Sequence, residues 1–461
     1  MHPVFLPAGQ SVPTIPITFV NAATWPAARE RLDLRSRNFV DAAGFEPKPG
    51  RHVLLPAAER GLAGVVFAIE SADESAKDLL RPGALADLLP PDAYRFANPP
   101  HDSRLAALAF ALGSYRFARY RKQEEKAAKL ELPANLDSDE VSRIVDGVFL
   151  ARDLINTPAN DMGPQELEEA ARAVANRHGA QLRVIVGDDL VTQNFPLIHA
   201  VGRAAARTPR LIDLTWGEPR YPKITLIGKG VCFDSGGLDI KPESGTLNMK
   251  KDMGGAATLL ALAHMLMDRR APLRLRLLIP AVENAISGSA FRPRDVYRSR
   301  KGLTVEIGNT DAEGRLILAD AIALADEDAP DLIIDMATLT GAARVALGTE
   351  IPPFYTDDDA LAAALAQSAA RETDPLWRMP LWRPYDQLLE SKTADLNNVA
   401  SGNFGGSITA ALFLRRFVTA AKAWLHFDIY AWNQTSKPGR PEGGECQGAR
   451  ALYRLLVERY G

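Results

Sequence analysis

Residues 223–242 read KITLIGKGVCFDSGGLDIKP and join a strand to a polar loop. The first part, KITLIGKG, is a short apolar run of the kind that forms a strand buried on both faces of a sheet. The glycines and charged residues that follow are typical of a loop. Open α/β sheets place their functional groups at such strand ends. The stretch therefore predicts an α/β fold with a site directly after this strand.

Three further apolar runs repeat the pattern. LRVIVG (182–187), LRLRLLIP (273–280) and DLIIDMAT (331–338) read as buried strands, and Ala/Leu-rich helical stretches separate them. Strands that alternate with helices favour parallel pairing in one sheet. From about residue 165 we therefore expect an α/β domain with a central, mostly parallel mixed sheet flanked by helices.

The first part of the chain has the pattern of a smaller α/β domain. Residues 16–125 alternate β-like runs with helical stretches such as 104–121. The segment 122–139 turns to charge and then to loop-forming residues, and a helix pattern follows over 138–156. We predict an N-terminal α/β domain, a linker with a bridging helix, and a larger C-terminal domain, at 1–130, 131–156 and 157–461.

Composition excludes several classes of protein. The 461 residues include 54 Lys or Arg and 57 Asp or Glu, so the net charge of −3 gives no reason to expect nucleic acid or a membrane as partner. Two cysteines, Cys232 and Cys446, cannot make a disulfide framework. The N-terminus MHPVFLPAGQ lacks a signal-peptide pattern, and no apolar run of about 18 residues is present. We expect a cytoplasmic protein with a small, roughly neutral substrate.

A second stretch, NTDAEGRLILAD (309–320), places Asp311, Glu313 and Arg315 at alternate positions before an apolar run. A structural interpretation is available: Asp311 caps a helix, Glu313 complements its dipole, and Arg315 forms an i, i+4 ion pair. The alternative is that both acids bind a common ligand.

Four more charged residues can likewise be interpreted either as structural or as binding a ligand. Lys229, Asp234 and Lys241 lie in the loop after the first strand, and Asp252 follows in KKDMGGAAT. Asp234 fits a turn, Asp252 fits a helix cap, and the lysines fit a solvated surface. GxxxxGK[ST] is absent, which argues against a phosphate loop.

The four carboxylates together favour metal binding. Their charge of −4 would be neutralised by two divalent cations, whereas four unpaired acids at one sheet edge would repel each other strongly. Oxygen-rich two-metal clusters activate water for hydrolysis. The motif HExxH and histidine pairs at zinc-ligand spacing are absent, which excludes a familiar single-zinc protease.

At this point the motifs GKGVCFDSGGLDIKP, KKDMGGAAT and NTDAEGRLILADA resemble those of the leucyl aminopeptidase (cytosol aminopeptidase) family. NTPAND, ATLTGA, WRMPL and HFDI stand in that family's order, and the resemblance covers about 145–461. It implies a metal-dependent aminopeptidase that removes the N-terminal residue of peptides, which need a free N-terminus.

The resemblance also implies ligands. Lys229, Asp234, Asp252 and Glu313 would surround one divalent ion, and Asp234, Asp311 and Glu313 the other. The ions would be Mn²⁺ or Zn²⁺, with Mg²⁺ as a further candidate. Lys229 must lose its proton to bind a metal, although the reference pKa of lysine is about 10.4.

Catalytic and substrate residues follow from the same resemblance. Arg315 would hold a bicarbonate ion that serves as general base, and Lys241 would stabilise the tetrahedral intermediate. The substrate's first side chain would lie among Met249, Asn309, Thr338, Leu339, Gly341, Tyr430 and Asn433. Tyr430 stands where many members have a small residue, so the preference for leucine is open.

Two expectations concern the whole assembly. Members of the family commonly form hexamers, which implies a homohexamer. Some bacterial relatives also bind DNA, so a non-catalytic DNA-binding or scaffold role is the alternative function. That alternative predicts damage to the ligand set, and none of the five ligands is missing.

Overall fold

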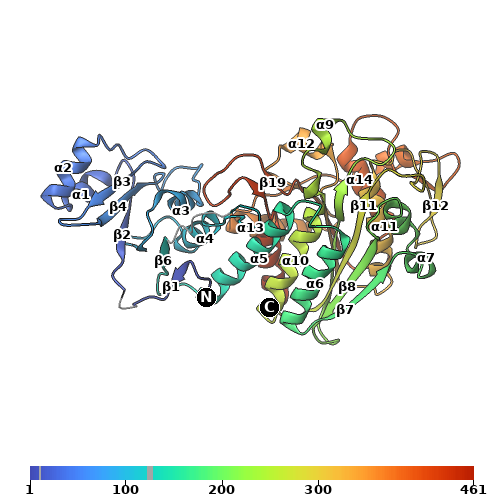
Figure 1. Cartoon of the computed structure of the whole chain (residues 1–461), viewed down its shortest axis with the longest axis horizontal. Helices are drawn as coiled ribbons and strands as arrows, with labels where there is room; N and C mark the ends of the chain where they lie inside the picture. Colours follow the sequence, from blue (N-terminus) through green and yellow to red (C-terminus); the bar gives the residue numbers. More distant parts are fainter. Residues whose placement is uncertain (10–11, 122–127) are drawn as a thin grey trace. The chain divides into compact units, whose positions relative to one another are not determined.

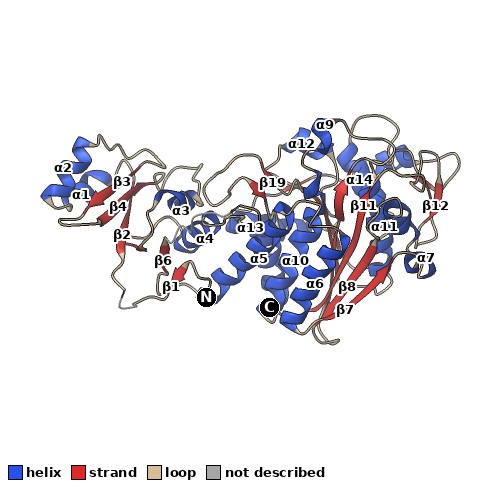
Figure 2. Cartoon of the chain, viewed as in Figure 1, coloured by secondary structure: helices blue, strands red, loops and turns tan. Residues whose placement is uncertain are grey.

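The computed structural model describes residues 1–9, 12–121 and 128–461, and these form two compact units. The first comprises 1–149 with 434–442, and the second comprises 150–433 with 443–461. The segment that we predicted as a boundary, 122–139, lies partly outside the described residues. Figures 1 and 2 show the elements of both units. The domain limits at 1–130, 131–156 and 157–461 stay a prediction.

The first unit is built on a six-stranded sheet with the order β1-β6-β5-β2-β4-β3, in which β3 and β4 alone pair antiparallel. Its strands are β1 (Phe5–Leu6), β2 (Ile15–Val20), β3 (His52–Pro56), β4 (Leu62–Ala68), β5 (Ala93–Phe96) and β6 (Lys129–Glu131). Its helices are α1 (Trp25–Glu30), α2 (Leu34–Ala42), η1 (Arg81–Ala84), α3 (Leu85–Leu88) and α4 (Ser103–Gly113). The small α/β domain that the sequence predicts is therefore present.

Helix α4 is shorter than the predicted stretch of 104–121. Asp102 caps its start by accepting a hydrogen bond from the backbone N–H of Leu105 at 2.8 Å. At its end Arg116 Nη1 donates to the carbonyl oxygen of Gly113 at 2.9 Å. This side chain satisfies a carbonyl that the helix leaves free, so the basic stretch stops the helix instead of continuing it.

Helix α5 (Ser138–Asn156) follows the predicted limits, and its residues fall in both units. The second unit then contains these elements: α6 (Pro164–His178), β7 (Gln181–Val186), α7 (Asp189–Thr192), α8 (Pro196–Gly202), β8 (Arg210–Trp216), β9 (Lys223–Gly228), β10 (Gly230–Asp234), α9 (Glu243–Thr246), η2 (Met249–Met253), α10 (Gly254–Asp268), β11 (Arg274–Asn284), β12 (Val296–Arg298), β13 (Thr304–Glu306), α11 (Glu313–Asp326), β14 (Leu332–Ala337), α12 (Gly341–Leu347), β15 (Pro353–Tyr355), α13 (Asp359–Glu372), β16 (Trp377–Arg378), η3 (Arg383–Leu389), β17 (Leu396–Asn397), α14 (Gly406–Arg415), β18 (Trp424–Asp428), β19 (Trp432–Asn433), β20 (Gly443–Gly444) and α15 (Ala449–Tyr460).

The main sheet has nine strands in the order β16-β15-β18-β14-β9-β11-β8-β7, with β10 also paired to β11. Strands β18, β14, β9 and β11 run parallel at its centre and are almost wholly buried, as their apolar sequences predict. Strand β7 differs from the prediction of a buried strand. It pairs antiparallel with β8 at the sheet edge, where most of its side chains are partly or fully exposed.

Helices cover the sheet on both faces (Figure 2). The apolar residues Leu316, Ile317 and Leu318 of α11 pack in one core cluster with Ile227 of β9. Helix α10 lies against β9 and β14, and Gly255 permits the close approach, because a Cβ there would lie 2.1 Å from the carbonyl oxygen of Met336. Helix α10 thereby holds Asp252, which lies just before it, and helix α11 holds Glu313, its first residue.

Several loops leave the carboxyl ends of the central strands together. Lys229 follows β9, Asp234 ends β10, Asn284 ends β11, Thr338 follows β14 and Asp428 ends β18. The parallel strands place these residues at one edge of the sheet, where the sequence predicts the site. Among the described helices, none is long and apolar enough to cross a membrane.

Candidate metal centre

A buried lysine lies at the middle of the site. Lys229 Nζ is 2.8 Å from Asp252 Oδ2 and 2.9 Å from Glu313 Oε1, and it donates to the carbonyl oxygen of Thr338 at 3.2 Å. The side chains of Lys229, Asp252 and Glu313 are each at most 3 % exposed. A lysine is thus held against two acids in a place that water hardly reaches.

Asp234 is held in place by the polar loop that the sequence predicts after this strand region. Its Oδ1 accepts hydrogen bonds from the backbone N–H of Gly236 and from Asn284 Nδ2, both at 2.9 Å. Gly236 and Gly237 have φ of +90° and +68°, and a Cβ on Gly236 would lie 2.5 Å from the carbonyl oxygen of Asp239. Glycine is required at this turn because other residues rarely adopt such φ values and because the chain leaves no space.

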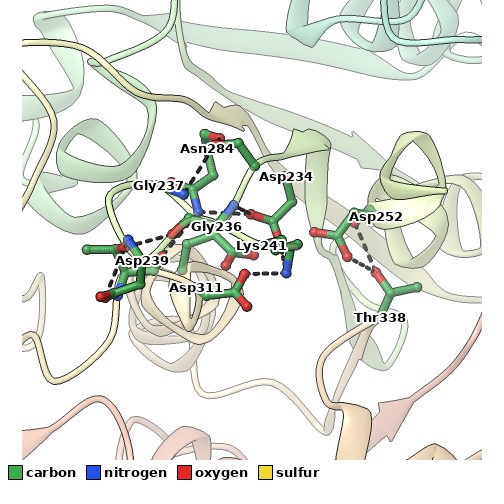
Figure 3. A network of polar contacts seen from close by, with 12 residues as sticks. Asp234, Gly236, Gly237, Asp239, Lys241, Asp252, Asn284, Asp311 and Thr338 are labelled. Atoms are coloured by element: carbon green, nitrogen blue, oxygen red, sulfur yellow. Dashed lines mark hydrogen bonds and ion pairs between the residues drawn. The ribbon is translucent and has the colours of Figure 1, made fainter. Parts of the chain in front are cut away.

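The second lysine joins the remaining acids (Figure 3). Lys241 Nζ lies 2.8 Å from Asp234 Oδ2 and also forms an ion pair with Asp311. The side chain of Asp311 is 32 % exposed, so this acid lies at the open margin of the cluster. Its loop is held by Thr310, whose hydroxyl donates to the carbonyl oxygen of Gly236 at 2.7 Å.

The donor set fits divalent cations. Asp234, Asp252 and Glu313 each offer a carboxylate oxygen within 4.8 Å of the others. Among the described residues, no group donates a hydrogen bond to either carboxylate oxygen of Glu313, although both are buried. Buried polar atoms almost always have partners, so these oxygens have the character of ligands for an ion. Asp311 is outside this group of three but lies beside it, since it interacts with Asp234 and pairs with Lys241.

The charges of the cluster shift its pKa values in a consistent direction. Burial lowers the pKa of Lys229, but the carboxylates of Asp252 and Glu313 outweigh it and raise that pKa above its ordinary value. Burial, followed by the charge of Asp234, raises the pKa of Glu313 to about 8 and that of Asp311 to about 6. The protein alone therefore holds extra protons here, which a divalent cation would displace.

The structural interpretation of these acids is only partly correct. Helix α11 begins at Glu313, its N-cap is Ala312, and no side chain caps it. Helix α10 likewise has Met253 as N-cap without a side-chain bond, so Asp252 is no cap. Asp234 does serve a turn through Gly236, as the structural interpretation proposes, while its second oxygen faces Lys241.

Arg315 is buried and only partly satisfied. Its Nη1 donates to the carbonyl oxygen of Asn398 at 2.6 Å, whereas its Nε is buried without a hydrogen bond from the described residues. Burial lowers the pKa of Arg315 to about 10, against the opposing effect of the Glu313 charge. The predicted i, i+4 ion pair with Asp311 is absent among the described contacts, because Asp311 pairs with Lys241.

The residues predicted to line the substrate pocket lie in four segments near this cluster. Thr338 Oγ1 donates to Asp252 Oδ1 at 2.7 Å, and Leu339 N donates to Asp428 Oδ1 at 2.9 Å. Asn309 Oδ1 accepts from the backbone N–H of Asp311 at 2.6 Å. These contacts place Thr338 and Asn309 beside Asp252 and Asp311 of the cluster, and Leu339 beside Asp428.

The other four predicted pocket residues differ in their hydrogen bonds and in the space beside them. Met249 opens η2, and Gly341 opens α12 with space beside it, since a Cβ there would meet only Arg344 Nη2 at 3.5 Å. The backbone N–H of Tyr430 donates to Gln447 Oε1 at 3.0 Å. Asn433 Nδ2 donates to Glu445 Oε2 at 2.6 Å, so its amide already has a structural partner.

Sequence reasoning missed three residues that hold the site. Asn284 bonds Asp234 and also the carbonyl oxygen of Thr310 at 3.1 Å. Asn398 accepts from Gly308 N at 2.7 Å and donates to the carbonyl oxygen of Asn309 at 2.8 Å. Asp428 accepts from two backbone N–H groups and from the Thr340 hydroxyl. A polar residue at the end of an apolar strand is the signal that marks Asn284 and Asp428.

Comparisons with known proteins agree with this geometry. Residues 149–453 match the model of the cytosol aminopeptidase family, catalytic domain, and residues 15–133 match the M17 aminopeptidase, N-terminal domain. A probable cytosol aminopeptidase of Syntrophotalea carbinolica is 41 % identical over 365 residues, covering 75 % of this chain and 73 % of the relative. One from Chlamydia trachomatis is 42 % identical over 379 residues, covering 78 % and 75 %.

Two solved structures are also similar over nearly the whole chain. The crystal structure of a cytosol aminopeptidase from Coxiella burnetii has a TM-score of 0.94 at 46 % identity and covers 99 % of this chain and 100 % of that one. The bottromycin maturation enzyme BotP in complex with Mn has a TM-score of 0.87 at 33 % identity, covering 97 % and 99 %.

Proposed function

Because this chain belongs to the cytosol aminopeptidase family, we propose that the cluster around Lys229 is its metal centre. The chain is a metalloaminopeptidase, an exopeptidase that acts on peptides. The observation that carries the proposal is the buried carboxylate of Glu313, whose two oxygens accept no hydrogen bond from the described residues. Buried carboxylates are paired or bind metals, and here one ammonium, that of Lys229, faces the carboxylates of both Glu313 and Asp252.

We propose that two ions bind here. Lys229, Asp234, Asp252 and Glu313 would hold one of them, and Asp234, Asp311 and Glu313 the other. When bound, the two cations supply Lewis acidity and activate water for attack on the peptide carbonyl. The solved relative with Mn makes Mn²⁺ the first ion to test, with Zn²⁺ and Mg²⁺ beside it.

The chain's own residues then have distinct tasks. Asp234 and Glu313 would bridge the two ions, and Asn284 orients Asp234 by its hydrogen bond. Lys241 would stabilise the negative charge that develops on the carbonyl oxygen, since its ammonium already faces the acids of the site. Cations bound by those acids would weaken their hold on the ammonium and leave it available to substrate.

Arg315 is proposed to hold bicarbonate as general base. Its buried Nε lacks a partner among the described residues, and an oxyanion would supply one. A guanidinium that is mostly buried also gains from an anion close by, because the anion offsets the cost of burial. Met249, Asn309, Thr338, Leu339, Gly341, Tyr430 and Asn433 are proposed to receive the substrate's first residue.

The direct test compares three substrate types with purified protein. An aminoacyl anilide, its N-acetylated form and a phosphomonoester are each incubated with Mn²⁺, Zn²⁺ or Mg²⁺. Cleavage of the free anilide alone supports an aminopeptidase, because acetylation removes the free N-terminus. Cleavage of the acetylated anilide or of the phosphomonoester at a similar rate would contradict it.

We also propose a homohexamer in the cytoplasm. The family resemblance supports the hexamer, and the relatives are named cytosol aminopeptidases. Large apolar side chains of the second unit, among them Leu247, Val345 and Phe404, are 88–91 % exposed, as residues of a subunit interface would be in an isolated chain. Light scattering of the purified protein measures the mass, and a monomer would contradict this proposal.

A further inference from the structure

Lys251 is a buried cation that the proposed metal centre does not use. It lies in η2 directly before Asp252, and its side chain is 1 % exposed. Its ammonium makes no hydrogen bond or ion pair with any residue that the structure describes. The contact that it does make is with the ring of Tyr430, whose centroid is 4.5 Å from Nζ. A ring face offsets only part of the cost of burying an ammonium.

A second cation approaches the same ring. Arg344 Cζ lies 5.2 Å from the centroid of Tyr430. The half-buried guanidinium donates a long hydrogen bond of 3.4 Å to the carbonyl oxygen of Thr340, and it has no carboxylate partner among the described ion pairs. Tyr430 therefore has two cations against it, neither of them neutralised by the protein.

The adjacent lysine, Lys250, does have a hydrogen-bond partner in the protein. Lys250 Nζ donates to the carbonyl oxygen of Asn156 at 2.7 Å, and it also lies 5.3 Å from the ring centroid of Trp432. Lys250 thus has a structural partner that Lys251 lacks. The pair gives a matched control within one turn of chain.

The acids near Lys251 are already engaged. Asp252 faces Lys229 and accepts from Thr338. Asp428 accepts from Leu339 N and Thr340 N, and from the Thr340 hydroxyl at 2.5 Å. Neither acid forms an ion pair with Lys251 or Arg344, so a bound ligand is the natural source of the missing negative charge.

The three segments that carry this group also carry residues proposed to receive the substrate's first side chain. Met249 is in η2 with Lys251, Gly341 is in α12 with Arg344, and Tyr430 follows β18. We propose that Lys251 and Arg344 bind the side-chain carboxylate of an acidic first residue, so that the enzyme favours peptides that begin with Glu or Asp. This inference rests on the proposed function and names its substrate class.

The test measures kcat/KM for the p-nitroanilides of Glu and Gln, which differ in charge but hardly in size. Wild type favours Glu about tenfold or more. Lys251→Met lowers the Glu to Gln ratio about 10- to 100-fold, as expected for a lost charged hydrogen bond. Arg344→Met lowers the Glu to Gln ratio less, since Arg344 is half-buried. The same partial exposure means that the Arg344→Met variant should fold. Lys250→Met leaves the ratio unchanged.

A binding measurement gives a second readout that does not depend on turnover. In calorimetry with the manganese-loaded protein, L-glutamate binds wild type more tightly than L-glutamine does, and Lys251→Met removes that difference. Equal binding of the two amino acids by wild type overturns the inference.

The outcomes separate this inference from the proposed function. If no anilide is cleaved, including those of Leu and Ala, the proposed function fails and this inference with it. If Leu or Gln anilides are cleaved and Glu is not favoured, or if Lys251→Met keeps the ratio, this inference alone is overturned. It is also overturned if Lys251→Met instead removes a preference for Leu-Gly over Leu-Gly amide, because the cations would then bind a carboxyl terminus.

Discussion

Helix α11 begins and ends with a buried carboxylate, and the two ends differ in what holds the charge. At its end, Asp326 accepts hydrogen bonds of 2.8–3.0 Å from the backbone N–H groups of Thr419, Ala420 and Ala421. At its start, Glu313 accepts none from the described residues. Burial opposes both charges, but the backbone donors lower the pKa of Asp326, whereas the pKa of Glu313 is raised to about 8.

We propose that the difference separates a structural acid, Asp326, from a metal ligand, Glu313. Asp326 joins the helix end to the loop before β18, and its partners are complete without any ion. Glu313 is placed by the same rigid helix, but the protein supplies only the nearby Lys229. A buried acid without donors destabilises the protein alone and becomes useful when a cation arrives.

The largest effect is expected for Glu313→Gln, which keeps shape and removes the charge. Loss of several kcal/mol of transition-state stabilisation, at about 1.4 kcal/mol per tenfold, corresponds to a fall in kcat/KM of about 10³-fold or more. Asp234→Ala should behave alike. Asp326→Asn is the control and should keep its rate per folded molecule. Steady-state kinetics on an aminoacyl anilide decides this, and full turnover by Glu313→Gln or Asp234→Ala contradicts the assignment.

The next effect concerns Lys241 and Arg315, which touch no ion in the proposed site. Lys241→Ala and Arg315→Ala should each lose about 10²–10⁴-fold in rate, as for a lost base or oxyanion stabiliser. Their manganese content should stay near that of wild type. Elemental analysis beside the kinetics checks both parts, and loss of metal would make these residues ligands.

At the other end of the helix, the expected effect is on stability. Asp326→Asn turns an amide N–H₂ toward backbone donors, which should lower the free energy of unfolding by about 1–3 kcal/mol. Because the pKa of Asp326 is lowered in the folded state, its contribution is present above its unfolded pKa and is lost as the pH falls through the folded value. Urea unfolding at pH 7 and pH 3 measures this. An equal difference at both pH values would show that the charge is unimportant.

The smallest effect is again on stability, and its dependence on pH is opposite in sign to that expected for Asp326. In metal-free protein the raised pKa of Glu313 means that the folded state holds a proton that the unfolded chain releases, so stability falls as the pH rises from about 5 to about 8. Glu313→Gln cannot release that proton and should be less sensitive to pH over this range. Thermal unfolding in excess chelator compares the two proteins. If the variant loses as much stability as wild type, the burial of this charge is not costly.

Much of the fold was predictable because the central strands are buried on both faces. Their apolar runs predict the limits of β9 and β14 closely, and the helix pattern over 138–156 predicts those of α5. Edge strand β7 was misjudged, since an apolar run says nothing of how many faces are covered. Helix α4 was drawn too long because the stop comes from a side chain, Arg116, and not from a turn residue.

At the site, the acids could be predicted from the sequence, but their hydrogen-bond and ion-pair partners could not. That Asp311, Glu313, Asp234 and Asp252 belong together follows from charge and motif, whereas their separate partners depend on tertiary contacts. Asn284 is 50 positions from Asp234 and Asn398 is 83 from Arg315, so no local pattern joins them. The same holds for Lys251, whose burial beside the ring of Tyr430 depends on a residue 179 positions away in the chain.

We propose that the Glu313 carboxylate at the start of α11, which accepts no hydrogen bond from the described residues, belongs to a metal centre, whereas the hydrogen-bonded Asp326 carboxylate at its end does not. The most direct measurement is Mn²⁺ binding by titration calorimetry to metal-free wild type, Glu313→Gln and Asp326→Asn. Wild type and Asp326→Asn should each bind two ions per chain, whereas Glu313→Gln should bind them more weakly or incompletely. Binding by Glu313→Gln that equals wild type in number and affinity, or no binding by folded wild type, would contradict it.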